Sequence, residues 1–268
     1  MINQAKFQQQ YGPWAVVAGA SEGMGAAYAD QLAAQGLNLV LIARRQELLA
    51  TLAGGLIDQY GIQVQTLALD LSQPGSTGEI IQQTSGLEIG LLVYNAAASV
   101  VGPFLDHSVD EHLKEIETNV RMPLVLTHHF AGKMLPRRRG GIILMSSLSA
   151  FQGSAFIANY AATKAFNILL AEGLWEEWRQ SGVDVMACVA GATSTPKYLA
   201  SNPKQTGRFS DATLPPQVVV REALAAIGKQ PFVIPGAVNR LSSFIMRHIL
   251  PRKMAIRMMG SVLRNMYT

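Results

Sequence analysis

A tyrosine and a lysine four residues apart, with a serine upstream, could move a proton to or from an oxygen atom. Tyr160 and Lys164 stand in the run Tyr-Ala-Ala-Thr-Lys, and a helix there would place the phenol and the ammonium on one face. A free phenol has a pKa near 10, but a neighbouring cation stabilises the phenolate and lowers that pKa. Ser147 could hydrogen-bond a substrate oxygen and orient it toward Tyr160. By themselves, a tyrosine and a lysine at this spacing are more often a pair on a helix surface.

Glycines after the first apolar run indicate a binding site for phosphate. They lie in segment 19–25, Gly-Ala-Ser-Glu-Gly-Met-Gly, between a strand-like run and a helical pattern. Glycine lets the backbone turn sharply and approach a pyrophosphate, whose charge is met by free N–H groups and the positive end of the helix. An ordinary tight turn is the alternative, but the position in a βαβ unit favours a dinucleotide. The expected cofactor contacts here are Gly19, Ser21, Glu22, Gly23, Met24 and Gly25.

Two arginines at the end of the second apolar run indicate which dinucleotide binds. An NAD site commonly places an acid here for the ribose 2′-hydroxyl, whereas an NADP site needs a cation for the 2′-phosphate. The sequence has Arg44 and Arg45 at this place and no acid. Arg44 could make a bidentate contact with the phosphate, and Arg45 could stack or assist. The alternative is a solvated first turn of the next helix, and the sequence favours NADP(H).

Apolar runs alternate with helical patterns along most of the chain, and these elements must position the candidate residues. Such alternation predicts βα units, a parallel sheet and helices on both faces. No linker rich in Pro, Gly or Ser separates two halves, so we expect a single doubly wound α/β domain. The expected strands are 14–18, 39–43, 64–69, 91–94, 142–145, 183–189 and 232–234, and the expected helices include 24–35, 46–60, 110–135 and 160–180.

The glycine segment and five further residues together resemble the short-chain dehydrogenase/reductase family. These residues are Asn95, Asn119, Ser147, Tyr160 and Lys164, in the order and spacing of the family. The resemblance implies a Rossmann-type sheet of seven parallel strands and hydride transfer at the B face of nicotinamide. It implies that Tyr160 is the general acid/base and that Ser147 positions the substrate oxygen. It also implies that Lys164 binds the nicotinamide ribose and lowers the pKa of Tyr160. Asn119 would hold a water in the proton relay.

Other positions carry over from the family one at a time. Asp70 resembles the acid that binds the adenine amino group, and Asn95 resembles the asparagine that stabilises the central sheet. Thr195 matches a threonine that contacts the nicotinamide carboxamide, and Arg44 matches the basic marker of NADP preference. The chain departs from the family at structural positions such as Ala18, where a threonine is usual. Two neighbours, Leu71 and Thr193, complete the expected cofactor contacts.

Short motifs give a narrower likeness. Segments 11–14, 20–23, 70–75 and 256–261 are similar to those of bacterial NADP-dependent 7β-hydroxysteroid dehydrogenases, which implies a bulky, apolar, steroid-like substrate. We therefore expect an NADP(H)-dependent oxidoreductase that interconverts a secondary alcohol and a ketone. The alternatives are a reductase of 3-oxoacyl thioesters, which would use the same centre, and a catalytically idle NADP-binding sensor.

Charge divides the chain unequally. Residues 223–268 carry seven Lys or Arg and no Asp or Glu, whereas the preceding part has a net charge of −3. We expect a catalytic domain over 1–236 and a basic, Met-rich helical extension over 237–268. Apolar residues at steps of three and four predict two amphipathic helices in the extension, separated by Pro251. The extension could cover the substrate cleft or pack on another subunit, which we favour; it could also lie on an anionic membrane surface or be partly disordered.

Composition excludes several classes of protein. A net charge of +4 is too small to indicate nucleic-acid binding, and the single cysteine, Cys188, excludes an internal disulfide framework. We expect no metal site, and the lack of a signal sequence or a long apolar run favours the cytoplasm. Family likeness makes the helix after Tyr160 the interface of a homodimer or homotetramer. Segment 196–216 could be a mobile lid or a solvated loop.

Overall fold

The computed structural model describes residues 3–200 and 213–267, without the side chains of Lys197, Met266 and Tyr267. At its centre lies a seven-stranded parallel sheet in the order β3-β2-β1-β4-β5-β6-β7, which confirms the expected α/β fold. The strands are β1 (Trp14–Ala18), β2 (Asn38–Ala43), β3 (Val64–Ala68), β4 (Ile89–Tyr94), β5 (Gly140–Ser147), β6 (Val183–Ala190) and β7 (Phe232–Val233).

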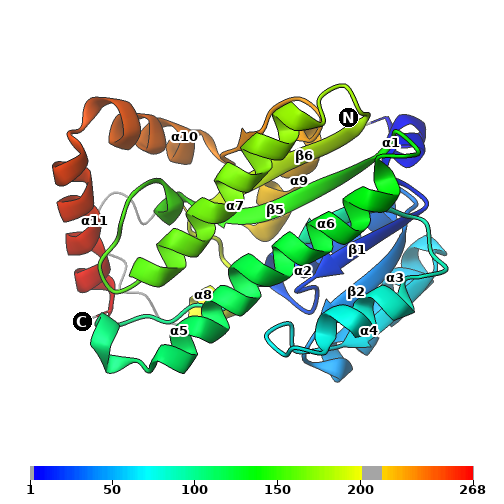
Figure 1. Cartoon of the computed structure of the whole chain (residues 1–268), viewed down its shortest axis with the longest axis horizontal. Coiled ribbons are helices and arrows are strands. Elements are labelled where there is room, and N and C mark those ends of the chain that lie inside the picture. The colour runs from blue at the N-terminus through cyan, green and yellow to red at the C-terminus, as the bar shows by residue number, and fades with distance from the viewer. Residues whose placement is uncertain (1–2, 201–212, 268) are drawn as a thin grey trace.

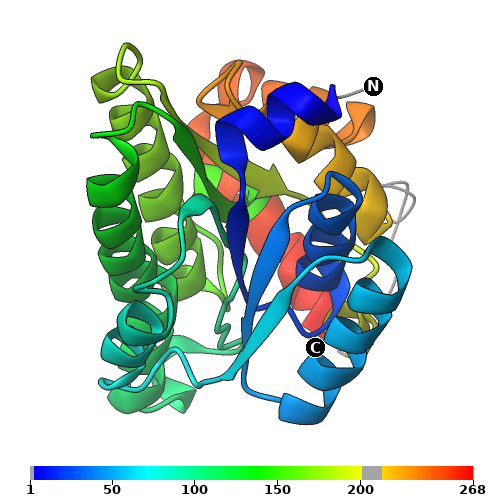
Figure 2. The ribbon, with the colours of Figure 1, turned by 90° about the vertical axis from the view of Figure 1, so that its right-hand side faces the viewer.

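Helices cover both faces of the sheet, as Figures 1 and 2 show. On one face pack α2 (Gly23–Ala34), α3 (Gln46–Tyr60) and α9 (Pro216–Ala226). On the other pack α4 (Ser76–Gln83), α6 (Met122–Met134) and α7 (Ala158–Glu177). The three-layer arrangement predicted from the alternating pattern is therefore confirmed.

The two apolar clusters explain why the strands are apolar throughout. Along β1, Val17 belongs to the cluster beneath α2 and α3, whereas Val16 belongs to the cluster beneath α6 and α7. A strand covered on both faces needs apolar residues at every position. Each large apolar side chain removed from water contributes about 1.5–3 kcal/mol, so a short strand such as β1 is held mainly by burial.

The helical pattern over residues 110–135 corresponds to two α-helices joined by a π turn rather than to one regular helix. The turn, Glu117–Arg121, connects α5 (Val109–Ile116) to α6. Pro123 has no N–H to donate to the Asn119 carbonyl four residues earlier, and Asn167 Nδ2 donates to that carbonyl instead, at 3.1 Å. Asn119 thus lies where the regular backbone pattern is broken.

Several helices were not among those expected from the sequence. The first, α1 (Gln4–Tyr11), is mostly polar and buries only Phe7 and Tyr11. Two apolar residues in one short segment give too weak a period to indicate a helix. The others are α4, α8 (Pro196–Ala200) and α9.

The end of the chain forms the two helices predicted on either side of Pro251. The first is α10 (Ala237–Phe244), which continues into a π turn, Ile245–Ile249, and the second is α11 (Arg252–Tyr267). In Figure 1, α11 runs down the side of the molecule away from the N-terminus. Among the described residues, the helices are too short or too polar for a membrane span.

Candidate active site

A large pocket opens at the carboxyl ends of the strands. Its volume is about 1370 Å³, and it runs from the glycine segment after β1 to the side chains of α11. In doubly wound sheets ligands bind at this edge, where the strand order reverses, here between β1 and β4. Pockets for one small molecule are usually about 300–1,000 Å³, so this pocket has room for a dinucleotide and a second molecule.

The glycine segment forms a cradle that admits no side chain at two of its positions. Gly19 has a φ of 81°, and a Cβ there would approach the Ala96 Cα to 2.7 Å. A Cβ on Gly25 would overlap the Gly19 carbonyl oxygen. The first turn of α2 follows at once, and its free N–H groups and positive end suit a phosphate. The cradle therefore fits a pyrophosphate approaching the backbone.

Asn95 ties the cradle to the centre of the sheet. Its Nδ2 donates to the Gly19 carbonyl at 2.8 Å, and its backbone N–H donates to the Ala18 carbonyl at 2.9 Å. These bonds fix the glycine turn against the end of β4, the position implied by family likeness.

The two arginines after β2 have different surroundings. Arg45 forms an ion pair with Glu22 at 2.8 Å and donates to Ser21 Oγ at 3.3 Å, so it closes over the glycine segment. Arg44 is exposed, lines the pocket, and has no hydrogen bond or ion pair with the residues that the structure describes. Arg44 is thus the arginine available to a phosphate.

Asp70 faces the same end of the pocket. Partial burial opposes its ionisation, but hydrogen bonds from Ser72 and the charges of Lys114 and Arg44 outweigh burial and hold the pKa of Asp70 below its usual value. Its Oδ1 accepts from the Ser72 N–H and hydroxyl, at 3.0 and 2.8 Å. Asp70 is therefore a fixed anionic acceptor, as a contact with an adenine amino group requires.

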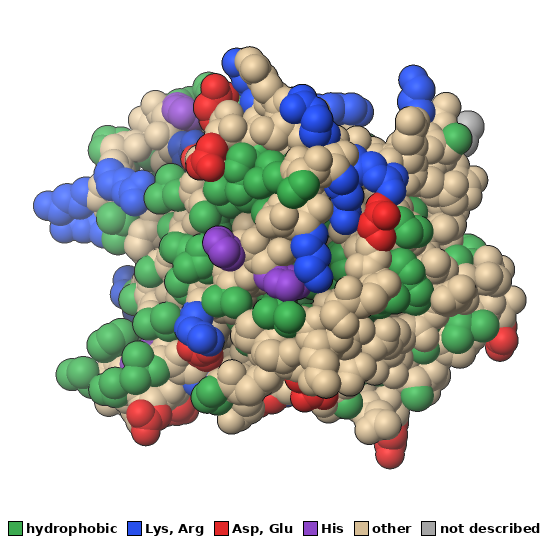
Figure 3. Space-filling view, turned by 45° about the vertical axis from the view of Figure 1, so that its right-hand side comes forward, with side chains coloured by type: hydrophobic (Ala, Val, Ile, Leu, Met, Phe, Trp, Pro, Cys, Tyr) green, Lys and Arg blue, Asp and Glu red, His purple; other side chains and the backbone are tan. Residues whose placement is uncertain are grey.

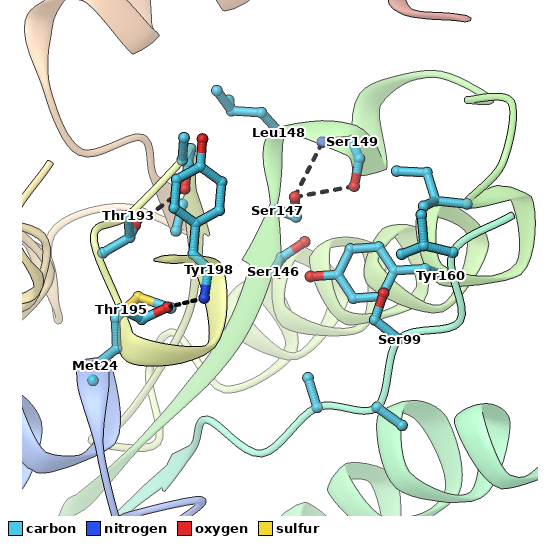
Figure 4. Close-up of a pocket in the computed structure, with 18 of the residues that line it drawn as sticks. Met24, Ser99, Ser146, Ser147, Leu148, Ser149, Tyr160, Thr193, Thr195 and Tyr198 are labelled. Carbon is cyan, nitrogen blue, oxygen red and sulfur yellow. Dashed lines mark hydrogen bonds between the residues drawn. The ribbon is translucent and has the colours of Figure 1, made fainter. Parts of the chain in front are cut away.

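Ser147 and Tyr160 both line the pocket (Figure 4). The phenol of Tyr160 comes from the first turns of α7 and points toward the end of β5, where Ser147 stands. Ser147 Oγ accepts from the Ser149 N–H at 3.3 Å and from the Ser149 hydroxyl at 3.0 Å. Since Ser147 is the acceptor in both bonds, its own O–H remains to be donated to a substrate oxygen.

Lys164 lies one turn further along α7 and is 2% exposed. Its Nζ donates to the Met145 carbonyl at 3.0 Å and lies 5.7 Å from the centre of the Tyr160 ring. The Ser146 hydroxyl donates to the Lys164 carbonyl at 2.7 Å and so fastens α7 to β5. The sequence placed phenol and ammonium on one helix face, and the fold holds both against the strand that ends in Ser147.

Asn119 is fully buried, and its side chain holds one wall of the pocket. Its Oδ1 accepts from the Ala98 N–H at 2.9 Å, while its Nδ2 donates to the Ala98 carbonyl at 2.8 Å and to Thr163 Oγ1 at 3.1 Å. The amide thereby joins the loop after β4 to α7. Its role in holding a water stays a prediction.

The remaining expected cofactor residues line the same pocket, namely Met24, Leu71, Thr193 and Thr195. A Cβ on Gly23 would come within 2.9 Å of Thr195 Cγ2, so the segment after β6 closes over the glycine segment. Thr193 pairs with Leu214, which brings both ends of the intervening segment together. Most of the expected lid, residues 201–212, lies outside the described residues.

The sequence did not single out Glu115, a fully buried carboxylate beside this site. Its Oε1 accepts from the Val100 N–H at 3.2 Å, and its Oε2 accepts from Asn159 Nδ2 at 2.6 Å. Burial raises the pKa of Glu115, although these bonds and the charges of His112 and Lys164 act against the rise. Glu115 thus connects the pocket loop to the residue before Tyr160. A lone glutamate on a polar helix gave no signal of this.

The far end of the pocket is walled by the chain's last two helices. Of the apolar residues that indicated them, Leu241, Phe244 and Ile249 remain largely exposed, whereas the polar Asn239 and Ser243 are buried. The amphipathic pattern thus predicted the helices but not the face that packs on the protein. The apolar side chains that the extension gives to the pocket are Ile245, Met246, Met258, Met259, Val262 and Leu263.

Two other features, the single cysteine and an arginine cluster before β5, are structural. Cys188 is buried in β6, where burial raises the pKa of its thiol to about 12. Arg137 and Arg139 donate to backbone carbonyls and pair with Glu88, so they are engaged within the fold.

Comparison with known proteins adds an independent line of evidence. The model of the family described as short chain dehydrogenase matches residues 13–206. A 7β-hydroxysteroid dehydrogenase of Collinsella aerofaciens is 33% identical over 260 residues, which cover 96% of this chain and 99% of the relative. A very-long-chain 3-oxoacyl-CoA reductase of Mus musculus is 31% identical over 272 residues, which cover 99% of this chain and 85% of the relative.

Two solved structures are similar in fold. One, of a 7β-hydroxysteroid dehydrogenase, matches with a TM-score of 0.89 and 33% identity, covering 95% of this chain and 99% of the other. The other, a short-chain dehydrogenase from Sphingobium yanoikuyae in complex with NADPH, matches with a TM-score of 0.76 and 27% identity, covering 87% and 92%. The likeness to the first structure extends over almost the whole length of both chains.

Proposed function

The chain belongs to the short-chain dehydrogenase/reductase family, and on that premise we propose that it is an NADP(H)-dependent oxidoreductase that interconverts a hydroxysteroid and its ketone. The observation that carries the proposal is the position of Ser147 and Tyr160 in one pocket, between a dinucleotide cradle and an apolar wall. The similarity to 7β-hydroxysteroid dehydrogenases supports the steroid.

The residues present fit NADP(H). The glycine cradle would hold the pyrophosphate, Arg44 the 2′-phosphate and Asp70 the adenine amino group. Thr193 and Thr195 line the pocket beyond the glycine segment, and Lys164 is buried beside Tyr160. These three residues would hold the nicotinamide half. When bound, NADPH supplies the hydride that reduces a ketone, and NADP+ accepts it in the reverse direction. A relative in complex with NADPH supports this assignment.

The chain's own residues would orient the ketone and supply its proton. Ser147 donates a hydrogen bond to the carbonyl oxygen and holds it near the Tyr160 hydroxyl. As negative charge develops on that oxygen, Tyr160 gives it the phenolic proton. The buried ammonium of Lys164 then stabilises the phenolate, because opposite charges attract strongly where water is scarce. Oxidation of the alcohol uses the same groups in reverse.

Replacement of Tyr160 by phenylalanine tests this proposal. We expect Tyr160→Phe to lower kcat for a 7-oxo steroid by about 10²- to 10⁴-fold, the usual contribution of general acid/base catalysis. The Kd of NADPH, measured by fluorescence titration, should change less than about twofold. Tyr198→Phe is the matched control, because Tyr198 is a second phenol in the same pocket. Retained turnover in Tyr160→Phe would exclude Tyr160 as the proton donor, and a large loss in Tyr198→Phe would transfer the role.

A second candidate function is the reduction of 3-oxoacyl thioesters. The similarity to the mouse 3-oxoacyl-CoA reductase, which extends over 99% of this chain, favours this function. The two functions share the reacting centre and differ in what fills the apolar end of the pocket. NADPH oxidation assayed with a 7-oxo steroid and with a 3-oxoacyl-CoA at equal concentration separates them. A higher kcat/KM for the thioester would replace the steroid proposal.

The outer face of α6 and α7 is a candidate interface between two copies of the chain. Apolar side chains gather on that side of the molecule in Figure 3, and Leu124 and Leu169 are 43% and 68% exposed. Exposed apolar residues on adjacent helices suit a symmetric contact. A monomer in analytical ultracentrifugation at micromolar concentration would exclude the homo-oligomer.

A further inference from the structure

The C-terminal extension, residues 237–268, turns an apolar face to the solvent. In α10 the buried residues Asn239 and Ser243 lie one helical turn apart. A period of 3.6 residues places Leu241 and Phe244 on the opposite side of the helix, where they are 63% and 56% exposed. The side chains that we call the outer face are large, apolar, exposed and outside the pocket, namely Val238, Leu241, Phe244, Ile249, Met254 and Ile256. So many on one short segment indicate a contact surface.

Cations accompany these apolar residues, and acids do not. The extension has six Lys or Arg and no Asp or Glu. Glu222, the last acid before it, pairs with Arg240 at 2.8 Å. In α11, Lys253 and Arg257 are exposed, lie one turn apart and flank Met254 in the sequence. A face that is both apolar and positively charged is complementary to a surface that is apolar and negatively charged.

A bilayer fits this face better than a second copy of the chain does. A two-fold contact would set the cations of one copy against the same cations of the other, and like charges repel. An anionic bilayer offers acyl chains to the apolar residues and negative headgroups to the cations. The two helices form one end of the molecule in Figure 1, so a flat surface can approach them without meeting the sheet.

The apolar surface of α11 also continues into the pocket. Met254, Met258 and Val262 follow one another at steps of four, and residues four apart are neighbours on a helix. Met254 lies outside the pocket, whereas Met258 and Val262 line it. A bulky apolar molecule concentrates in the hydrocarbon of a bilayer rather than in water. Contact between the extension and a bilayer would therefore bring the pocket close to dissolved apolar molecules.

We propose that the outer face of the extension binds the surface of an anionic lipid bilayer. Leu241 and Phe244 enter the layer of acyl chains, while Lys253 and Arg257 contact the headgroups. Both helices lie along the surface, because cations occur from Arg240 onward through the extension and must stay with headgroups or water. This inference goes beyond the proposed function, since the binding needs neither the cofactor nor turnover.

Sedimentation of the full-length protein with sucrose-loaded vesicles tests the proposal. Vesicles of phosphatidylcholine with phosphatidylglycerol are compared with vesicles of phosphatidylcholine alone, and the bound fraction gives a partition coefficient for each. The apolar pair of substitutions is Leu241→Ser with Phe244→Ser. The charge pair is Lys253→Gln with Arg257→Gln. Neither pair touches a residue that lines the pocket.

Matched control pairs carry the same kinds of substitution on other surfaces. Leu48→Ser with Ile57→Ser removes two exposed apolar residues from α3. Lys6→Gln with Lys229→Gln removes two exposed cations outside the extension. The Kd of NADPH, measured by fluorescence titration, should be the same in wild type and in all four variants, which shows that each is folded.

Wild type should bind the anionic vesicles at least about 10-fold more strongly than the neutral ones. The charge pair should lower binding to anionic vesicles by about 10- to 30-fold, because each cation near such a surface contributes about fivefold. The apolar pair should lower it at least about 10-fold, and each control pair less than about threefold. Equal binding of wild type to both vesicles, or equal losses in the extension pairs and the control pairs, would overturn the proposal. Absence of binding to either vesicle would overturn it in favour of an acidic protein surface.

Discussion

The two ends of the pocket are built by different means. At the nucleotide end the backbone of the segment after β1 forms the surface, and Gly19 and Gly25 leave no room for a Cβ. At the substrate end much of the surface consists of side chains, and those from α11 include Met258 and Leu263. A surface made of backbone tolerates few residue types, whereas one made of side chains changes with each substitution. The comparison indicates how one cofactor site can serve relatives with different substrates.

The largest expected effect tests the rigid end. In Gly25→Ala the new Cβ would overlap the Gly19 carbonyl oxygen, so the cradle must shift. Its N–H groups would then no longer point at the pyrophosphate. Overpacking costs about 1–3 kcal/mol, and lost hydrogen bonds to phosphate add a similar amount. We therefore expect the Kd of NADPH to rise at least about 100-fold, measured by fluorescence titration.

Two further glycines serve as controls for this substitution. A Cβ on Gly55, within α3, would meet nothing within 4 Å, and one on Gly260, within α11, would meet Ala155 Cβ at an ordinary 3.6 Å. Both Gly55→Ala and Gly260→Ala should leave the Kd of NADPH unchanged, and each should favour its helix by about 0.5–1 kcal/mol. If Gly25→Ala binds NADPH as tightly as these controls, the cradle is not rigid and the contrast between the two ends fails.

The next effect separates the two arginines of the nucleotide end. Arg44→Ala should weaken NADPH binding by about 10- to 100-fold and leave NADH binding nearly unchanged, because only NADPH carries the 2′-phosphate. Arg45→Ala should change the Kd of NADPH less than about fivefold, since Arg45 is occupied by Glu22 and exposed pairs contribute little. Titration of both variants with both cofactors measures the preference. A larger loss in Arg45→Ala would assign the phosphate to Arg45 and leave Arg44 as a solvated residue.

The same contrast explains which features could be predicted from the sequence. Gly19 and Gly25 can be recognised in the sequence because backbone geometry permits only glycine there. Strands such as β1 can be recognised because burial on both faces demands apolar residues. Tyr160 and Lys164 can be recognised because their spacing matches one helical turn. Each of these is a local requirement that a short stretch of sequence displays.

The substrate end depends on contacts between distant segments, which no local pattern displays. The guanidinium of Arg247 contacts the ring of Phe151, about a hundred residues earlier in the chain, and that of Phe232. The extension's amphipathic period predicted two helices, yet Leu241 and Phe244 stay exposed while Asn239 is buried. Tertiary packing therefore decided which face turned inward. The role of Glu115 could not be predicted from the sequence for the same reason, because its partners Val100 and Asn159 belong to other elements.

The smallest expected effect concerns Glu115, which fixes the wall of the substrate end. Both of its oxygens accept hydrogen bonds, whereas a glutamine would turn a donor toward Asn159 or Val100. Glu115→Gln should cost about 1–3 kcal/mol of unfolding free energy and lower kcat/KM about fivefold, mainly through KM, as the pocket loop loosens. NADPH binding should be unchanged, because the nucleotide end is built independently. Loss of NADPH affinity in Glu115→Gln would show that the two ends are coupled.

Urea unfolding of wild type and Glu115→Gln at a series of pH values measures what the Glu115 carboxylate contributes to the free energy of unfolding. Burial raises the pKa of Glu115 in the folded state above its ordinary value of 4.5, so between these two values the folded protein binds more protons than the unfolded chain. Wild type should therefore lose stability as pH rises from about 4.5 through the raised pKa. The glutamine variant does not titrate there, and its deficit relative to wild type should shrink over the same range. A deficit that is constant with pH would mean that Glu115 is as well solvated when folded as when unfolded, and that the wall of the substrate end is open to water.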